Sequence, residues 1–457
     1  MTTTKVQKRL FGTNGVRGVV GKDLTPDLVL RIGEALGTIR QGQIAVGRDT
    51  RTSGETLIGA LKAGLLATGC NVIDCGILPT PALQYLVKEH YDGGAMITAS
   101  HNPPEYNGVK IIEPDGTEMG DEEILQLEDL IFAPSVPVKP WDQVGKEVAA
   151  PHLVDEYVQA IVRQFPGRPG EGMTVVVDPG SGPSCLTTPA ILRAIGCRVL
   201  TINGIMDGTF PGRLPEPSPE GLNGLAALVI ANKASFGIAH DGDADRAVFI
   251  DEKGHFIEEN KEFALIAHYI CKEAKGTVVT PVSTSQMVEI VATMAGCETT
   301  YTPVGSIYVA RTMRKLINAG KTIIFGGEGN GGLIFPNHQF CRDGGMTAAT
   351  MVSLLSNTKQ NLSVLVDQLP KRHLIKEKIT TSRGNELLQQ LDLLYKNQAP
   401  DHTDGLKIRR GSSWVLIRVS GTEPLVRIMV DADEKDTGNA IAWEIEEAII
   451  RILNRMT

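Results

Sequence analysis

The chain has 457 residues, of which 42% are hydrophobic and 21% are charged, as in ordinary globular proteins. Because a single hydrophobic core stops growing well before this length, we expect three or four domains. The formal net charge is -8, and lysines and arginines are scattered along the chain, so no nucleic-acid or anionic-membrane partner is indicated. A small anionic substrate is still compatible with local positive sites.

The N-terminus, MTTTKVQKRLFGTNG, lacks the apolar core of a signal peptide, and no apolar run is long enough to cross a bilayer. We therefore expect a cytoplasmic protein. The 7 cysteines are an odd number in a long chain without a secretory signal, which argues against a disulfide framework. The absence of a Cys-x-x-Cys pair argues against a zinc ribbon.

One pattern of strand, polar loop, helix, Gly-Cys and second strand recurs three times. Its first halves are GQIAVGRDTRTSGE, GMTVVVDPGSGPSC and GTVVTPVSTSQ, and its second halves are LKAGLLATGCNVIDCGILPTPA, AILRAIGCRVLTINGI and EIVATMAGCETTYTPVGS. Each copy is a βαβ unit, so we expect three topologically similar α/β domains with mixed, mostly parallel sheets. The glycine suits a helix C′ position, and Cys70, Cys197 and Cys297 are interpreted as packing residues.

The last quarter of the chain departs from this pattern. NELLQQLDLLYK has helical spacing, KIRRGSSWVLIRVSGTEPLVRIMVDAD reads as two β runs joined by a Gly-Thr-Glu-Pro turn, and a long amphipathic helix follows. This predicts a C-terminal α+β domain. The expected domains are residues 1–148, 149–256, 257–366 and 367–457.

Four loops could carry chemistry, and the first is TASHNPPEYNGVK, residues 98–110. A short apolar run precedes it, so Ser100 lies at the end of a strand. A serine needs a neighbouring base, or a phosphate already attached, to be a useful nucleophile. From these residues alone, a nucleophile and a turn-capping serine are equally supported. G-x-S-x-G is absent, so a hydrolase nucleophile elbow is not supported.

The second loop, in FGIAHDGDADRAVFID, carries the alternating carboxylates Asp241, Asp243 and Asp245. Three carboxylates this close repel one another unless a cation neutralises them. An EF-hand is excluded because Arg246 replaces the required glycine and the flanks read as strands. Oxygen ligands in a short loop favour Mg²⁺ over the alternative of a solvated acidic loop.

The third loop lies in KTIIFGGEGNGGLIFP. Its G-x-G-x-x-G matches a dinucleotide fingerprint only formally, because a strand-like, proline-stopped segment follows instead of a helix. Gly-Lys-Thr mimics the end of a P-loop, but the required first glycine falls on Lys315. Glu328 therefore lies on a glycine-rich turn, either as an acceptor for ligand hydroxyls or as an incidental hairpin residue.

The fourth loop runs from Arg418 to Arg427 as RVSGTEPLVR. This loop would form an anion nest for a phosphate monoester. The nest would consist of the hydroxyls of Ser420 and Thr422, the backbone N–H groups freed by Gly421 and the two arginines. The alternative is a polar hairpin with solvated arginines.

Five motifs are distributed in order over nearly the whole chain, and together they resemble those of the α-D-phosphohexomutase superfamily. They are FGTNGVRG, TASHNP, DGDADR, GGEGNGG and RVSGTEPLVRI. The resemblance implies four domains around a central cleft, each giving it one loop. It implies an isomerase that interconverts hexose 6-phosphate and hexose 1-phosphate through a phosphoserine enzyme and a hexose 1,6-bisphosphate, which also serves as activator. It further implies a Mg²⁺ cofactor, and a homodimer is left open.

The resemblance also implies a role for each loop. Ser100 would carry the phosphate and, with Asp241, Asp243 and Asp245, hold Mg²⁺. Arg246 and Arg17 would cancel charge on the transferring group. Lys110 and His101 are candidates for proton transfer, and the family pattern favours Lys110. A lysine buried beside cations can have a lowered pKa, and we expect this of Lys110. The substrate would be bound by Glu328, Asn330, Arg418, Ser420, Gly421, Thr422 and Arg427.

The sugar is less sharply indicated. Phosphoglucosamine mutases usually have serine where this chain has Asn330, a departure that resembles an archaeal-type branch for which glucosamine, glucose and mannose phosphates are all credible. FGTNGVRG is closer to the start of phosphoglucosamine mutases, so glucosamine 6-phosphate is the first choice. The alternatives are a broad phosphoglucomutase/phosphomannomutase, a serine phosphatase and a non-catalytic sugar-phosphate-binding protein.

Overall fold

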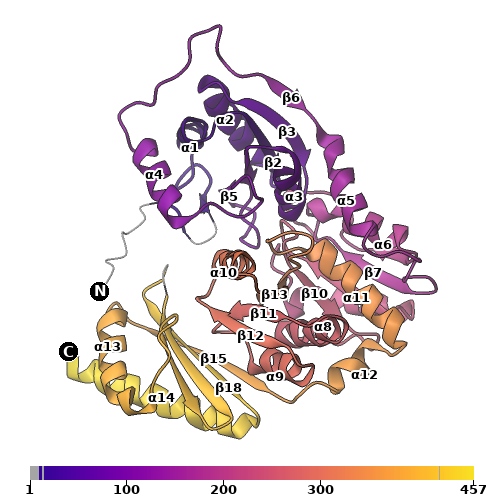
Figure 1. Cartoon of the computed structure of the whole chain (residues 1–457), viewed down its shortest axis with the longest axis vertical. Helices are drawn as coiled ribbons and strands as arrows, with labels where there is room; N and C mark the ends of the chain where they lie inside the picture. Colours follow the sequence, from indigo (N-terminus) through magenta and orange to yellow (C-terminus); the bar gives the residue numbers. More distant parts are fainter. Residues whose placement is uncertain (1–9, 13–14, 421–422, 457) are drawn as a thin grey trace. The chain divides into compact units, whose positions relative to one another are not determined.

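A computed structural model describes residues 10–12, 15–420 and 423–456, which form two compact units. Unit 1 comprises the chain up to Glu258 together with Gly331–Val366, and unit 2 comprises Glu259–Asn330 and Asp367–Thr457. Within the described ranges no helix is both long and apolar enough to cross a membrane. Figure 1 labels the helices and strands.

The first sheet of unit 1 has the strand order β1-β5-β4-β2-β3-β6. Its central strands β4, β2 and β3 are parallel, and β5 runs antiparallel to both β4 and β1. Helices α1, α2 and α4 pack their apolar faces on one core with this sheet. The elements are β1 (Val16–Val19), α1 (Pro26–Ile39), β2 (Gln43–Arg48), α2 (Gly54–Ala67), β3 (Asn71–Ile77), α3 (Thr80–His90), β4 (Gly93–Ile97), β5 (Tyr106–Ile112), α4 (Asp121–Ile131) and β6 (Glu147–Ala149).

The second sheet of unit 1 has the order β10-β9-β7-β8, with β9 and β10 antiparallel and the other pairs parallel. Helix α11, from later in the chain, packs against α5 and α6. Asp343 caps the N-terminus of α11 and also accepts a hydrogen bond of 2.6 Å from Tyr157 of α5. The elements are η1 (Pro151–Leu153), α5 (Val154–Val162), β7 (Thr174–Asp178), η2 (Pro183–Leu186), α6 (Thr188–Ala194), β8 (Arg198–Thr201), η3 (Pro219–Leu222), α7 (Asn223–Ala231), β9 (Phe236–His240), β10 (Ala247–Ile250), β14 (Gly332–Ile334), α11 (Gly344–Thr358) and α12 (Leu362–Asp367).

The predicted Gly-Cys repeat is confirmed as a helix terminator. Gly69, Gly196 and Gly296 follow α2, α6 and α9 with φ of 91°, 108° and 74°. In each copy the backbone N–H of the next residue, a buried cysteine, donates to a carbonyl five residues earlier, at 3.1, 2.9 and 2.9 Å. This bond satisfies a carbonyl that the helix end leaves open. All seven cysteines are free thiols.

Unit 2 contains the parallel strands β12, β11 and β13 and an antiparallel sheet of order β15-β18-β17-β16. Helices α13 and α14 cover one face of the antiparallel sheet (Figure 1) and share its core. The predicted C-terminal α+β domain is confirmed, with four strands instead of two β runs. The elements are α8 (Glu259–Glu273), β11 (Thr277–Pro281), α9 (Gln286–Met294), β12 (Glu298–Thr302), α10 (Ser306–Asn318), β13 (Ile323–Glu328), β15 (His373–Thr380), α13 (Gly384–Tyr395), η4 (Lys396–Gln398), β16 (Leu406–Arg410), β17 (Ser413–Val419), β18 (Leu425–Ala432) and α14 (Lys435–Met456).

Candidate active site

Ser100 lies just beyond the end of β4 in unit 1, as the sequence predicts. It is buried, and its φ of 51° places it in the left-handed region, which non-glycine residues seldom adopt. Its Oγ donates a hydrogen bond of 2.7 Å to Oδ2 of Asp241, a residue far away in sequence. The hydroxyl is therefore aimed at the acidic loop and does not cap its own turn.

The serine loop is held by Arg51, a fully buried residue that follows β2. Its Nε pairs with Asp49 at 3.1 Å, and Asp49 also accepts from Thr98 at 2.6 Å. The two terminal nitrogens donate to backbone carbonyls of the serine loop. These acceptors are Ser100 (2.8 Å), Asn102 (2.6 Å), Pro103 (2.6 Å) and Tyr106 (2.9 Å). One rigid guanidinium thus fixes the strained backbone around Ser100.

Asp241, Asp243 and Asp245 lie in the loop between β9 and β10, and all three are buried. One carboxylate oxygen from each lies within 4.8 Å of the others. Burial and the neighbouring Asp245 and Asp243 raise the pKa of Asp241 to about 7, against the opposing charge of Arg246. The Oδ1 atoms of Asp243 and Asp245 are buried without a hydrogen-bond partner. An oxygen-only site with unsatisfied carboxylate oxygens fits Mg²⁺.

Lys110 of β5 is buried against this cluster. Its Nζ donates to Oδ2 of Asp243 at 2.8 Å and to Oδ2 of Asp245 at 3.2 Å. Burial opposes the charged form of Lys110, but the two carboxylates outweigh it, so the pKa of Lys110 lies above its ordinary value. The expectation of a lowered pKa is wrong for this arrangement, because the nearest groups are anions rather than cations.

Arg246 forms ion pairs both with Asp241 of the acidic loop and with Glu216, which lies outside that loop. Its Nε lies 3.2 Å from Oδ2 of Asp241, and its terminal nitrogens form a two-pronged pair with Glu216 at 3.0 and 3.1 Å. Arg342 pairs with Asp245. Arg17 donates to Oδ1 of Asn102 at 3.0 Å. The structure thus surrounds the acidic cluster with cations able to face a phosphoryl group.

His101 is the other proton-transfer candidate in unit 1. Its Nδ1 lies 3.4 Å from Oγ of Ser100 and 3.8 Å from Oε2 of Glu216. Burial and the Arg246 charge lower the pKa of His101 to about 4, although Glu216 opposes them. The imidazole is therefore neutral near pH 7 and has a nitrogen able to accept a proton.

Unit 2 carries the other predicted residues. Glu328 ends β13 and is buried, with Asn330 two residues on. A side chain at Gly329 would approach Oδ1 of Asn260 to 2.2 Å, so this turn requires glycine.

The predicted anion nest lies on the C-terminal sheet of the same unit. Arg418 and Arg427 face each other across β17 and β18. Oγ of Ser420 accepts from the backbone N–H of Glu423 at 3.3 Å. Gly421 and Thr422 lie outside the described residues.

Sequence reasoning missed Asp49, Arg51, Glu216 and Arg342. A signal existed for the first two, because Asp49-x-Arg51 follows the strand of the first repeat. The carboxyl ends of parallel strands meet at one edge of a sheet, and β2 pairs directly with β4, which leads to Ser100. Glu216 and Arg342 lie in irregular segments and carry no comparable signal.

Family models for phosphoglucomutase/phosphomannomutase match four parts of the chain. Alpha/beta/alpha domains I, II and III match residues 8–136, 155–254 and 258–373, and the C-terminal domain matches residues 374–448.

Curated relatives are similar over almost their whole length. A phosphoglucomutase/phosphomannomutase of Thermococcus kodakarensis is 43% identical and covers 94% of this chain and 95% of its own. A phosphoglucosamine/phosphogalactosamine mutase of Sulfurisphaera tokodaii is 38% identical, with coverage of 96% and 99%. A probable phosphoglucosamine mutase of Methanopyrus kandleri is 39% identical, with coverage of 98% and 99%.

Solved structures share the fold. A phosphoglucomutase/phosphomannomutase family protein from Burkholderia thailandensis superposes with a TM-score of 0.85 at 26% identity and covers 96% of each chain. A putative phosphomannomutase from Thermus thermophilus gives a TM-score of 0.81 at 26% identity, with coverage of 97% and 99%.

Proposed function

The chain belongs to the α-D-phosphohexomutase superfamily and is a hexose-phosphate mutase, and from that premise we propose that Ser100 is its phosphate carrier and glucosamine phosphate its main substrate. The reaction would pass a phosphate from Ser100 to the free hydroxyl of a hexose monophosphate. The resulting 1,6-bisphosphate would then return its other phosphate to Ser100, so that the position of the phosphate on the sugar changes while the enzyme is restored.

One observation carries the assignment of Ser100. Its Oγ lies 2.7 Å from Oδ2 of Asp241 within a cluster of three buried carboxylates, two of which have an oxygen without a hydrogen-bond partner. A turn-capping serine needs no such neighbours. A serine that alternates between free and phosphorylated forms needs a site that can neutralise a phosphate dianion, and a divalent cation beside it would do so.

The residues of unit 1 divide the remaining work. Bound Mg²⁺, held by Asp241, Asp243 and Asp245, would supply positive charge to the transferring phosphoryl group. Arg246 and Arg17 add hydrogen-bond donors for its equatorial oxygens. Arg51 keeps the serine oxygen in line for attack and departure. The neutral imidazole of His101 can take the proton of the attacking hydroxyl directly, whereas Lys110, charged beside Asp243 and Asp245, can do so only after it has released its own proton. The group that takes this proton would return one to the departing oxygen in the reverse half.

The residues of unit 2 would bind the rest of the substrate. Glu328 and Asn330 would take hydroxyl or amino groups of the sugar. Arg418, Ser420, Gly421, Thr422 and Arg427 would bind the phosphate that is not being transferred.

The names of the relatives support two kinds of substrate, amino-sugar phosphates and the phosphates of glucose or mannose. Those from Sulfurisphaera tokodaii and Methanopyrus kandleri carry phosphoglucosamine mutase in their names. The relative from Thermococcus kodakarensis is a phosphoglucomutase/phosphomannomutase, which favours glucose and mannose phosphates as a second candidate. We place glucosamine 6-phosphate first, because two of the three names and the FGTNGVRG start agree on it.

The carrier is tested by the intact mass of Ser100→Ala. We expect wild-type protein treated with glucose 1,6-bisphosphate to gain one phosphate and Ser100→Ala to gain none and to lose isomerase activity. Ser181→Ala is a matched control, because Ser181 is also buried with a left-handed φ of 57°. A fully active Ser100→Ala enzyme would rule out the mechanism.

The substrate is tested by kcat/KM for glucosamine 6-phosphate, glucose 1-phosphate and mannose 1-phosphate on one preparation. We expect the highest value for glucosamine 6-phosphate. A clear preference for mannose phosphate would overturn that choice. Release of inorganic phosphate faster than isomerisation would favour a phosphatase instead.

A further inference from the structure

A row of cations crosses the C-terminal sheet of unit 2. Lys378 of β15 lies directly opposite Arg427 of β18, and Arg427 lies directly opposite Arg418 of β17. Lys376 is two residues from Lys378, so both lysines project from the face that carries Arg427. Like charges placed directly opposite in a sheet destabilise it. Such a row therefore requires compensation by anions.

The protein supplies only part of that compensation. Asp404 pairs with Arg418 at 2.8 Å, and Glu423 pairs with Arg427 at 3.0 Å. Lys376 and Lys378 are exposed, and neither has an ion-pair partner in the part of the chain that the structure describes. The two lysines thus extend the arginine nest without a carboxylate of their own.

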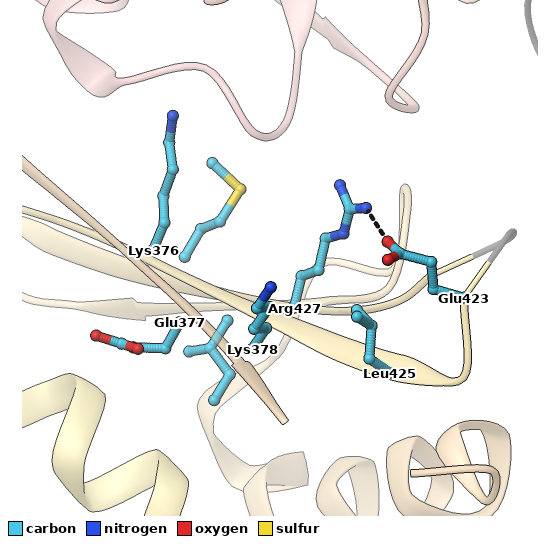
Figure 2. A pocket seen from close by; sticks show the side chains of 8 residues that line it. Lys376, Glu377, Lys378, Glu423, Leu425 and Arg427 are labelled. Atoms are coloured by element: carbon cyan, nitrogen blue, oxygen red, sulfur yellow. Dashed lines mark hydrogen bonds and ion pairs between the residues drawn. The ribbon is translucent and has the colours of Figure 1, made fainter. Parts of the chain in front are cut away.

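A cavity of about 530 Å³ lies beside the two lysines, a size that suits a small ligand. Figure 2 shows Lys376 and Arg427 on the same side of the strands, whereas Glu377 points elsewhere. The lining combines these cations with the apolar side chains of Leu425, Ile428 and Met429. The lining residues are Lys376, Glu377, Lys378, Glu423, Leu425, Arg427, Ile428 and Met429.

We propose that Lys376 and Lys378 form, with Arg427, a second anion subsite beside the phosphate nest, and that it takes the phosphate monoester group of the substrate as it enters and leaves. The inference rests on the proposed function. Because the whole chain carries a net charge of -8, it repels a sugar phosphate dianion at long range. A local group of cations beside the nest offsets this repulsion and raises the association rate.

A simpler role for the two lysines must be separated from this one. β15 is an edge strand of its sheet, and lysines on edge strands prevent pairing with other chains. That role predicts altered aggregation but no change in substrate affinity. The affinity for phosphate esters therefore distinguishes the two roles.

The test uses the double variant Lys376→Gln/Lys378→Gln in the full chain. We expect KM for hexose phosphate to rise roughly fivefold to tenfold with kcat within about twofold, the size of effect that loss of exposed charge contacts gives. The fall of kcat/KM with added salt should become shallower, because fewer charges attract the substrate. Lys396→Gln is the control: it removes an exposed lysine of the same unit, in η4, away from this sheet face.

Binding without turnover gives a second readout. In a Ser100→Ala background, calorimetric titration with inorganic phosphate should show weaker binding for the double variant than for Lys396→Gln. Equal affinities and equal salt dependences would overturn the subsite, as would a loss confined to kcat. If the protein isomerises no hexose phosphate, the proposed function fails, and the phosphate titration still decides on the subsite.

Discussion

Arg51 shows how a buried charge is used to shape a loop. It has no exposed surface, yet its guanidinium pairs with Asp49 and donates to four carbonyls of the serine loop. Burying such a charge is unfavourable unless its donors are satisfied. The satisfied network can in turn offset the left-handed φ of Ser100, which costs of order 1 kcal/mol.

We predict that Arg51→Lys lowers kcat by about 10- to 100-fold, since an ammonium group cannot reach all four carbonyls and Ser100 would lose its alignment. KM should change little, because Arg51 makes its contacts to the protein backbone. Steady-state kinetics and the rate of Ser100 phosphorylation by glucose 1,6-bisphosphate measure both effects.

Arg48→Lys is a control for Arg51→Lys, because it also replaces a guanidinium by an ammonium group. Arg48 lies in the same segment and pairs with Glu55, which is largely exposed. Arg48→Lys should keep kcat within about twofold, because its carboxylate partner is solvent-exposed and, among the described residues, Arg48 donates no hydrogen bond to the serine loop. Equal kcat losses in the two variants would show that Arg51 does not position the serine.

The residues that sequence reasoning found and missed differ in their context. Ser100 and the three aspartates lie at strand ends inside distinctive local motifs, so their chemistry can be inferred locally. The guanidinium network of Arg51 depends on β2 and β4 being neighbours in the sheet. The raised pKa of Lys110 depends on Asp243 and Asp245, which are distant in sequence. Three-dimensional proximity of this kind leaves no local pattern.

At the level of elements, helix ends offer a test of the Gly-Cys repeat. Gly296 follows α9 with a φ of 74°, and an added Cβ would meet no heavy atom within 4 Å. Gly59 lies within α2, where an added Cβ would also meet nothing within 4 Å. The two glycines therefore differ in backbone conformation and not in available space.

We predict opposite effects for alanine at these two glycines. Gly296→Ala should lower the free energy of unfolding by about 1 kcal/mol, because alanine is strained in the left-handed region. Gly59→Ala should raise it by about 0.5–1 kcal/mol, because alanine favours the helix. Chemical denaturation measures both, and effects of the same sign would contradict this account of the repeat.

Lys407 of β16 is an unusual buried cation in unit 2. Its Nζ donates to the carbonyl of Val282 at 2.7 Å and lies 4.2 and 4.7 Å from the ring centroids of Trp414 and Tyr301. Burial lowers the pKa of Lys407 from 10.5 to about 8, although Asp401 opposes the shift. The two aromatic rings favour the charged form and limit the effect.

We predict that Lys407 makes unit 2 more stable as the pH rises from about 8 to about 10.5. In this window the unfolded chain still holds the proton that the folded protein has released, so the free energy of unfolding rises with pH. Below about pH 8 Lys407 is charged in the folded protein as well, so the cost of burying this charge lowers the free energy of unfolding by its full amount. The shift corresponds to at most about 3 kcal/mol, and the ring contacts reduce our expectation to about 1–2 kcal/mol.

Lys407→Met isolates this contribution, because methionine fills a similar space without a titratable group. The difference in free energy of unfolding between wild type and Lys407→Met should shift in favour of wild type between about pH 7.5 and about pH 9.5. Comparison with the variant cancels the contributions of cysteines and tyrosines. A difference independent of pH would contradict the lowered pKa.

The strands of the C-terminal domain show where element prediction failed. HLIKEKIT forms β15, although it places two apolar residues side by side and then three charged residues in a row, which is not the alternation of a half-exposed strand. The pattern of KIRRGSSWVLIRV predicts one β run, but Gly411, with a φ of 63°, lies between β16 and β17. The sequence therefore carries no period-2 signal for β15, and the short turn at Gly411 is hard to recognise because strand-favouring residues such as Ile408 and Val415 lie on both sides of it.

At the scale of the whole molecule, the repeat predicted three α/β domains and the comparisons agree. The division into two compact units had no such signal. Gly331–Val366 belongs to unit 1, and the ties to Tyr157 through Asp343 and to α5 and α6 through α11 join segments far apart in sequence. The predicted boundaries near 148, 256 and 366 stay predictions.

The two units lead to a prediction for metal binding. Asp241, Asp243 and Asp245 all lie in unit 1, so Mg²⁺ should stabilise unit 1 selectively by relieving the repulsion among buried carboxylates. At a hundredfold excess over the dissociation constant, the stabilisation is about 2.7 kcal/mol. Hydrogen exchange should therefore slow across β9 and β10 when Mg²⁺ is added and stay unchanged across β17 and β18.

Carboxylate variants distinguish the metal site from a general effect of the cation. Asp243→Asn should abolish the Mg²⁺-dependent protection, because it removes an anionic ligand and leaves a weaker amide acceptor. Glu328→Gln also removes one buried carboxylate, but from unit 2, and should leave the protection of β9 and β10 intact. Protection that persists in Asp243→Asn, or that is equal in both units, would mean that the ion binds elsewhere. Protection confined to unit 1 and lost only in Asp243→Asn would tie the cation to the loop that Ser100 contacts, which is the arrangement phosphoryl transfer from this serine requires.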